Sequence, residues 1–81
     1  MAATRQDVNR WIALAKKEKD KFIISVCDTW DYEDYPVFCE NKEKLIEEYP
    51  KYNGVNMQRI NEIIRINDDG TVTENLNINT I

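Results

Sequence analysis

The six residues Phe22-Ile-Ile-Ser-Val-Cys27 are mostly apolar and rich in β-branched side chains. This composition favours a short β-strand. Successive side chains of a strand point to opposite faces, and both faces of this strand are mostly apolar. We therefore expect a central strand of a sheet, covered by a helix on at least one side.

A helix is predicted before this strand. Thr4 and Asp7 have the spacing of a capping box, in which two side chains satisfy free backbone N–H groups of the first turn. Apolar residues follow at helical spacing, and the lysines after them suit the negative end of a helix dipole. The pattern predicts a helix over residues 5–19, with Trp11 as a core anchor.

A hairpin and a second helix are predicted after the central strand. The stretch Tyr35-Pro-Val-Phe-Cys-Glu40 has the composition of a second strand, which pairs with the first around a loop at 28–34. Asn41 can cap a helix that Pro50 ends within a residue or two.

The remaining chain predicts two further strands. Residues 55–62 fit a helix as well as a strand. Asp68-Asp69-Gly70 is a hairpin-turn signal, so we expect strands at 59–67 and 71–78. The element order α-β-β-α-β-β predicts one α+β domain over residues 1–81, with a four-stranded antiparallel sheet and the helices packed on one face. The expected core is Val8, Trp11, Ile12, Phe22, Ile24, Val26, Val37, Leu45, Ile46, Ile60 and Ile64.

The composition argues against several classes of function. The 81 residues carry 11 Lys and Arg against 15 Asp and Glu, a net charge of −4, so nucleic-acid phosphates should repel the chain as a whole. No apolar run is long enough to span a bilayer. The two Cys fit a reducing compartment, and we expect a cytoplasmic protein. The chain has no His, which is the commonest general base and metal ligand.

The densest feature is the loop Asp28-Thr-Trp-Asp-Tyr-Glu-Asp-Tyr35, which alternates carboxylates with aromatic rings. An ordinary hairpin loop needs only turn-forming residues, and exposed aromatic side chains are enriched at binding hot spots. Two interpretations stay open, a partner-binding surface and a lid of rings folded back over the core. The candidate partner-binding residues are Trp30, Asp31, Tyr32, Glu33 and Asp34, and a secondary basic surface comprises Arg10, Lys16 and Lys17.

No pattern predicts a catalytic, cofactor or metal site. Neighbouring carboxylates on one loop rarely form the opposite walls that an acid–base pair needs. The Gly70 turn resembles part of a calcium-binding loop, but that alignment puts Arg65 and Leu76 at positions that require acidic ligands. Cys27 and Cys39, expected as neighbours on paired strands, have no basic residue beside them to activate a thiolate.

The run Val26-Cys-Asp-Thr-Trp-Asp-Tyr-Glu-Asp-Tyr-Pro-Val37 resembles a family of small uncharacterised bacteriophage and prophage proteins. Those proteins continue into a G-x-N-M-Q segment, which Gly54-Val-Asn-Met-Gln58 matches, and the resemblance covers residues 8–66. Trp30 stands where Phe is usual, and residues 67–81 have no counterpart. The resemblance implies a phage gene product that acts inside a bacterial cell, and it implies no particular activity.

Three functions stay open for such a protein. The first is a non-enzymatic inhibitor of a host factor, as anti-CRISPR proteins are, whose loop carboxylates replace phosphates in the basic groove of a partner protein. The second is an accessory protein of phage replication or assembly. The third is an oligomeric sponge that holds a small nucleotide between Trp11 or Trp30 and Arg10 or Lys16. None of the three requires direct binding to nucleic acid or to a membrane.

A homodimer is also expected. A sheet covered on one face leaves its other face open, and Ile23, Ile63 and Phe38 remain after the core has been assigned. A two-fold dimer would bury these side chains.

Overall fold

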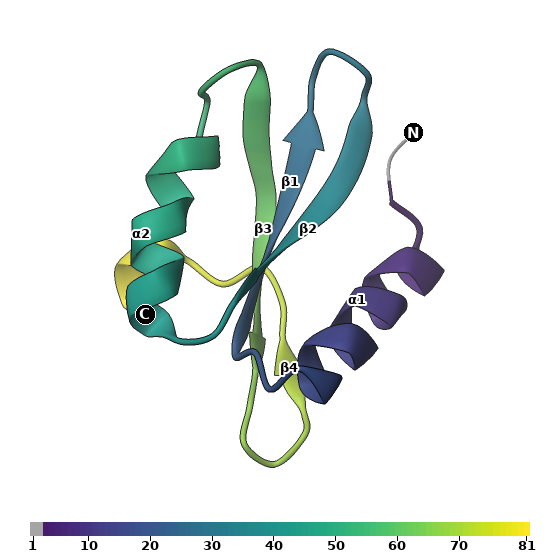
Figure 1. The fold of residues 1–81 in the computed structure, drawn as a ribbon, viewed down its shortest axis with the longest axis vertical. Coiled ribbons are helices and arrows are strands. Elements are labelled where there is room, and N and C mark those ends of the chain that lie inside the picture. The colour runs from purple at the N-terminus through teal and green to yellow at the C-terminus, as the bar shows by residue number, and fades with distance from the viewer. Residues whose placement is uncertain (1–2) are drawn as a thin grey trace.

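The computed structural model describes residues 3–81, in which two helices and a four-stranded antiparallel sheet confirm the α+β class and the order α-β-β-α-β-β. The elements are α1 (Arg5–Lys17), β1 (Phe22–Asp28), β2 (Glu33–Cys39), α2 (Lys42–Tyr52), β3 (Gln58–Ile66), β4 (Val72–Thr73) and the 3-10 turn η1 (Ile78–Thr80). The strands are arranged in the order β2-β1-β3-β4, so β1 and β3 are the inner strands (Figure 1).

The two helices lie on opposite faces of the sheet (Figure 1). Ile23 of β1 packs with Trp11 beneath α1, whereas its neighbour Ile24 packs with Leu45 beneath α2. The prediction that both helices cover one face is therefore wrong. A central strand that is apolar on both faces needs cover on both, and one helix supplies each.

A β-bulge in β3 changes which side chains face each helix. Ser25 pairs with Glu62 while the next residue, Val26, pairs with Ile60, so Asn61 is an extra residue in β3. The extra residue interrupts the strand alternation. Ile60 and Ile63 consequently both face α2, a spacing that a sequence pattern cannot distinguish from a helix.

The second helix begins at its predicted cap, where Asn41 Oδ1 accepts the N–H of Lys44 at 2.8 Å. Leu45 is fully buried, and Tyr49 packs against the same cluster. Ile46 was expected in the core but is 53% exposed. Ile46 lies about 100° around the helix axis from Leu45, so the side chain of Ile46 points away from the sheet.

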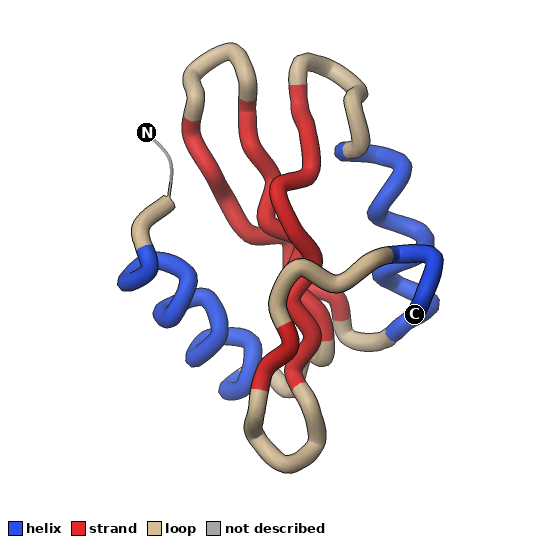
Figure 2. The backbone as a smooth tube through the Cα atoms, turned by 180° about the vertical axis from the view of Figure 1, so that it is seen from behind, coloured by secondary structure: helices blue, strands red, loops and turns tan. Residues whose placement is uncertain are grey.

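The last strand is much shorter than the predicted 71–78. Only Val72 and Thr73 pair with β3. Asn75 has a positive φ of 54°, and after it the chain crosses to the α2 face, where Leu76 and Ile78 pack (Figure 2). The C-terminal segment therefore completes a core layer instead of extending the sheet.

The side chains assigned to a dimer interface are used within the monomer. Ile23 and Ile63 are buried on opposite faces of the sheet, and Phe38 packs against the α1 cluster. The predicted reason for a two-fold dimer is therefore wrong, because the second helix covers the face that was expected to be open.

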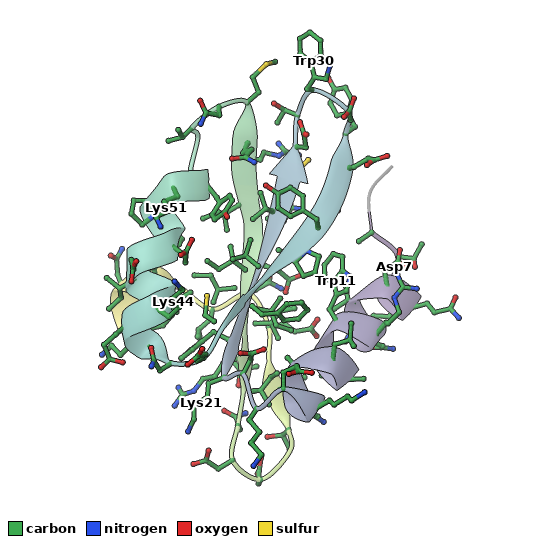
Figure 3. The ribbon with its side chains drawn as sticks, in the orientation of Figure 1. Asp7, Trp11, Lys21, Trp30, Lys44 and Lys51 are labelled. Carbon is green, nitrogen blue, oxygen red and sulfur yellow. The ribbon has the colours of Figure 1, made fainter. Side chains whose placement is uncertain are left out.

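Trp11 is 6% exposed between α1 and the sheet (Figure 3), whereas Leu14 on the same helix is 45% exposed. We expect Trp11→Ala to lower the free energy of unfolding by about 3–5 kcal/mol. Leu14→Ala, the matched control, should lower it by less than about 1 kcal/mol. Urea denaturation followed by circular dichroism measures both, and similar losses in the two variants would contradict the packing of α1.

Candidate protein-binding surface

The loop between β1 and β2 is only four residues long, from Thr29 to Tyr32. Glu33 and Asp34, which were expected in the loop, begin β2 and pair with the end of β1. Trp30 and Tyr32 are 72% and 71% exposed, and Trp30 projects from the tip of the hairpin (Figure 3). The loop thus presents two aromatic rings to solvent on a short, defined turn.

A second loop is held against the first. The backbone N–H of Thr29 donates to the carbonyl oxygen of Met57 at 2.8 Å, and the Thr29 hydroxyl donates to the same oxygen at 2.5 Å. Met57 ends the connection between α2 and β3. We call residues 28–33 together with 53–57 the loop end of the molecule, opposite the hairpin between β3 and β4 (Figure 1).

Exposed apolar side chains are concentrated at the loop end. Six large apolar side chains within residues 3–81 are exposed, and four of them belong to its two loops. The four are Trp30, Tyr32, Val55 and Met57. Leu14 and Ile46, the other two, lie singly on the helices, and scattered single residues of this kind are ordinary. The loop end is therefore the part of the described chain with the character of a protein-binding patch.

The carboxylates of the loop end divide into free and engaged groups. Asp31 and Glu33 are exposed and form no ion pair within residues 3–81. Asp28 Oδ1 accepts the N–H of Trp30 at 2.9 Å, and Asp34 Oδ2 accepts the N–H of Ala3 at 2.8 Å. Asp31 and Glu33 therefore supply the available negative charge, whereas Asp28 and Asp34 also hold the backbone.

Tyr35 is the one aromatic residue of the acidic-aromatic run that turns inward. Its ring meets Tyr52 edge to face, with the centroids 6.4 Å apart, and its hydroxyl accepts a hydrogen bond from Gln58. Burial is the main cause that raises the pKa of Tyr35. The lid interpretation thus describes Tyr35, while Trp30 and Tyr32 stay outside the core.

Three residues of the two loops other than glycine have backbones in the left-handed region. Tyr32 has a φ of 56°, and Asn56 and Met57 have φ values of 54° and 62°. This conformation is unfavourable for a bulky side chain such as Tyr. Positions of this kind concentrate at binding and catalytic sites, where a side chain is retained in spite of local strain.

Sequence reasoning missed Val55, Met57 and the role of Thr29. Two apolar residues in a turn beside Asn53 and Gly54 are a departure from turn chemistry that could have indicated exposure. The hydrogen bonds from Thr29 join loops far apart in the chain, so no local pattern reports them.

The residues of the secondary basic surface are not gathered at one site. The guanidinium of Arg10 is 2.9 Å from Asp7 Oδ1 on the same helix. Lys16 lines a concave surface with Lys19 and Lys21 at the opposite end of the molecule from Trp30. Lys17 is exposed and does not line that surface.

The nucleotide alternative requires an aromatic ring and a basic side chain close enough to hold one ligand between them. Trp11 is buried under α1. Lys16 shares a concave surface with Lys21, which lies at the end of the molecule opposite Trp30 (Figure 3). Trp11 is therefore not free to stack on a ligand, and Trp30 and Lys16 are not brought together.

The two cysteines are not neighbours, contrary to expectation. Cys39 pairs with Phe22 and faces α2, whereas Cys27 pairs with Asp34 near the other end of β1 and faces the α1 side. Burial is the main cause that raises the pKa of the Cys39 thiol from 9.0 to about 11. Cys39 is consequently a packing residue that stays protonated near neutral pH.

Comparison with protein-family models, curated proteins and solved structures gives no match. Within residues 3–81, no helix is long and apolar enough to cross a bilayer, and no group of three Cys, Asp or Glu side chains could hold a metal ion.

Replacing Tyr32 by Asn should stabilise the fold, because Asn tolerates the left-handed conformation better than Tyr does. We expect Tyr32→Asn to raise the free energy of unfolding by about 0.5–1 kcal/mol, measured by urea denaturation. Trp30→Asn is the control, since Trp30 is similarly exposed but has no positive φ, and it should bring no gain. A destabilised Tyr32→Asn protein would mean that the ring supports the core.

Proposed function

We propose that this protein is a non-enzymatic, phage-type binding protein that inhibits a bacterial defence nuclease of the CRISPR class inside the host cytoplasm. The observation that carries the proposal is the pair of hydrogen bonds from Thr29 to Met57, which hold two loops and their four exposed apolar side chains at one end. The phage context comes from the sequence resemblance around residues 26–37.

The apolar part of the loop end has the composition of an interface centre. Trp and Tyr are enriched among the few residues that dominate binding free energy, and Met adapts to irregular surfaces. The loops are short and joined by hydrogen bonds, so little conformational entropy is lost when they dock. Trp30 and Tyr32 are the proposed anchors, with Val55 and Met57 beside them.

The charge of the loop end determines the kind of partner. Asp31 and Glu33 are free carboxylates next to the rings, and cationic side chains are scarce in these loops. A nuclease binds its guide or target in a groove lined with Lys and Arg, which attracts carboxylates as it attracts phosphates. The loop end would occupy such a groove and exclude the nucleic acid.

An infection assay tests the proposal directly. Bacteria whose CRISPR nuclease targets a phage are challenged with that phage while they express this protein, across several nuclease types. We expect the wild-type chain to restore infection for at least one type, and the double variant Trp30→Ala/Tyr32→Ala to lose that effect because it lacks both anchors.

The matched control is Leu14→Ala/Ile46→Ala, which also truncates two exposed apolar residues but leaves the loop end intact. This control should restore infection as the wild type does. Equal loss in both double variants would rule out the loop end as the contact, and no restoration by the wild type against any nuclease type would reject the counter-defence function.

The role of the loop carboxylates in association is tested by surface plasmon resonance with the inhibited nuclease. Asp31→Asn/Glu33→Gln should slow association about three- to tenfold at low salt, because free carboxylates steer the approach to a basic groove. The difference should disappear near 0.5 M salt, where the Debye length falls to about 4 Å.

A charge-matched control removes two carboxylates from α2, in Glu43→Gln/Glu47→Gln, which lie outside the loop end. This variant should associate at a rate near that of the wild type. If both double variants slow association equally, the effect is one of net charge and the loop end has no special role.

A further inference from the structure

A separate concave surface lies on the α1 side of the sheet, next to the loop end. The N-terminal segment and the first turn of α1 form one wall, and β1, β2 and β3 form the floor, enclosing about 290 Å³. Tyr32 stands at its rim. This volume lies just below the range of about 300–1,000 Å³ that is usual for drug-sized ligands, so it suits a smaller molecule.

The floor contains the hydroxyl of a mostly buried serine. Ser25 is 4% exposed, lines the concave surface, and makes no side-chain hydrogen bond within residues 3–81. Its oxygen is not sealed from the surface, since no fully enclosed side-chain oxygen in the described chain lacks a partner. The Ser25 hydroxyl is therefore open to a molecule that enters the concave surface.

Two opposite charges bracket this floor without pairing. Cys27 of β1 lies between Asp34 of β2 and Arg59 of β3 in one cross-strand row, and all three line the concave surface. Two strand spacings separate the backbones of Asp34 and Arg59 by about 10 Å. No ion pair within 4 Å joins them, and Arg59 has no ion pair elsewhere in residues 3–81.

We propose that this concave surface binds a free α-amino acid as its zwitterion. The ammonium group would donate to Asp34 and to the Ser25 hydroxyl, and the carboxylate would accept from the guanidinium of Arg59. Asp34 has an oxygen available, since only Oδ2 receives the N–H of Ala3. This inference is independent of the proposed inhibition, because it requires no protein partner.

The charge pattern disfavours the simpler ligands. A lone cation would have to sit beside Arg59, and a lone anion beside Asp34 and Glu62, which all line the same surface. A nucleotide phosphate would meet one guanidinium among two carboxylates. A zwitterion places each of its charges next to an opposite one.

Two-dimensional ¹H–¹⁵N NMR titration of the isolated protein with each common free amino acid tests the proposal. Each titration runs to about 10 mM, which nearly saturates a site with a Kd of 1 mM. We expect at least one amino acid to cause saturable shifts at residues 25–27 and 59–62. The matching amine without a carboxylate, and the N-acetyl derivative without an ammonium, should each bind about tenfold more weakly.

Variants test whether the ligand contacts the predicted side chains. Asp34→Asn, which keeps an oxygen for the N–H of Ala3, and Arg59→Gln should each weaken binding about tenfold. The controls Glu33→Gln and Arg65→Gln change exposed residues on the same two strands and should leave binding unchanged. If the NMR spectrum shows that Asp34→Asn is unfolded, Arg59→Gln alone tests the site, because Arg59 is exposed.

Three results would overturn the proposal. One is the absence of saturable shifts with every amino acid. Another is an amine or an N-acetyl derivative that binds as tightly as the amino acid. The last is binding that Arg59→Gln does not weaken. None of these results bears on whether the loop end inhibits a nuclease.

Discussion

The burial of β1 on both faces is the constraint on which the rest of this small domain depends. Every side chain from Phe22 to Cys27 is withdrawn from water, and their backbones are paired with neighbours on both sides. An 81-residue chain has little apolar surface to spare, so each face of β1 receives one helix. The C-terminal segment supplies what α2 cannot cover, with Leu76, Ile78 and Ile81 packed on that face.

The same arrangement fixes the loop end. β1 leads into the loop that carries Trp30, and β3 follows the loop that carries Met57, so the two loops leave adjacent strands at one end of the sheet. The bulge at Asn61 lets β3 bury Ile60 and Ile63 on one side and still direct Arg59 to the other. The loop end and the concave surface therefore both lie on the inner strands β1 and β3.

Local patterns predicted the elements well and their arrangement less well. The capping box of Thr4 and Asp7 forms as expected, as does the hairpin turn at Gly70, because both depend on residues close in sequence. The face covered by α2 could not be read locally, since Leu45 and Ile46 are both apolar and only tertiary packing decides between them.

The candidate site, too, could be predicted from the sequence only in part. The exposure of Trp30 and Tyr32 follows from too many aromatic residues in too short a loop, which is visible in the sequence. The contribution of Val55 and Met57 depends on the hydrogen bonds that join the loops next to β1 and β3. The opposition of Asp34 and Arg59 depends on strand order and on the bulge. Neither leaves a signal at a fixed spacing along the chain.

β1 pairs with β2, which is close to it in the sequence, and with β3, which is distant in the sequence. This difference affects how the chain folds. β2 follows β1 after a four-residue loop and can pair within microseconds, whereas β3 is separated from β1 by β2, α2 and their loops and is expected to pair more slowly. Until then the hairpin presents the unpaired edge of its most apolar strand. The other edge carries Pro36, which has no N–H to offer to a second chain. We therefore expect the hairpin to pair with a second chain mainly along the β1 edge, before β3 docks.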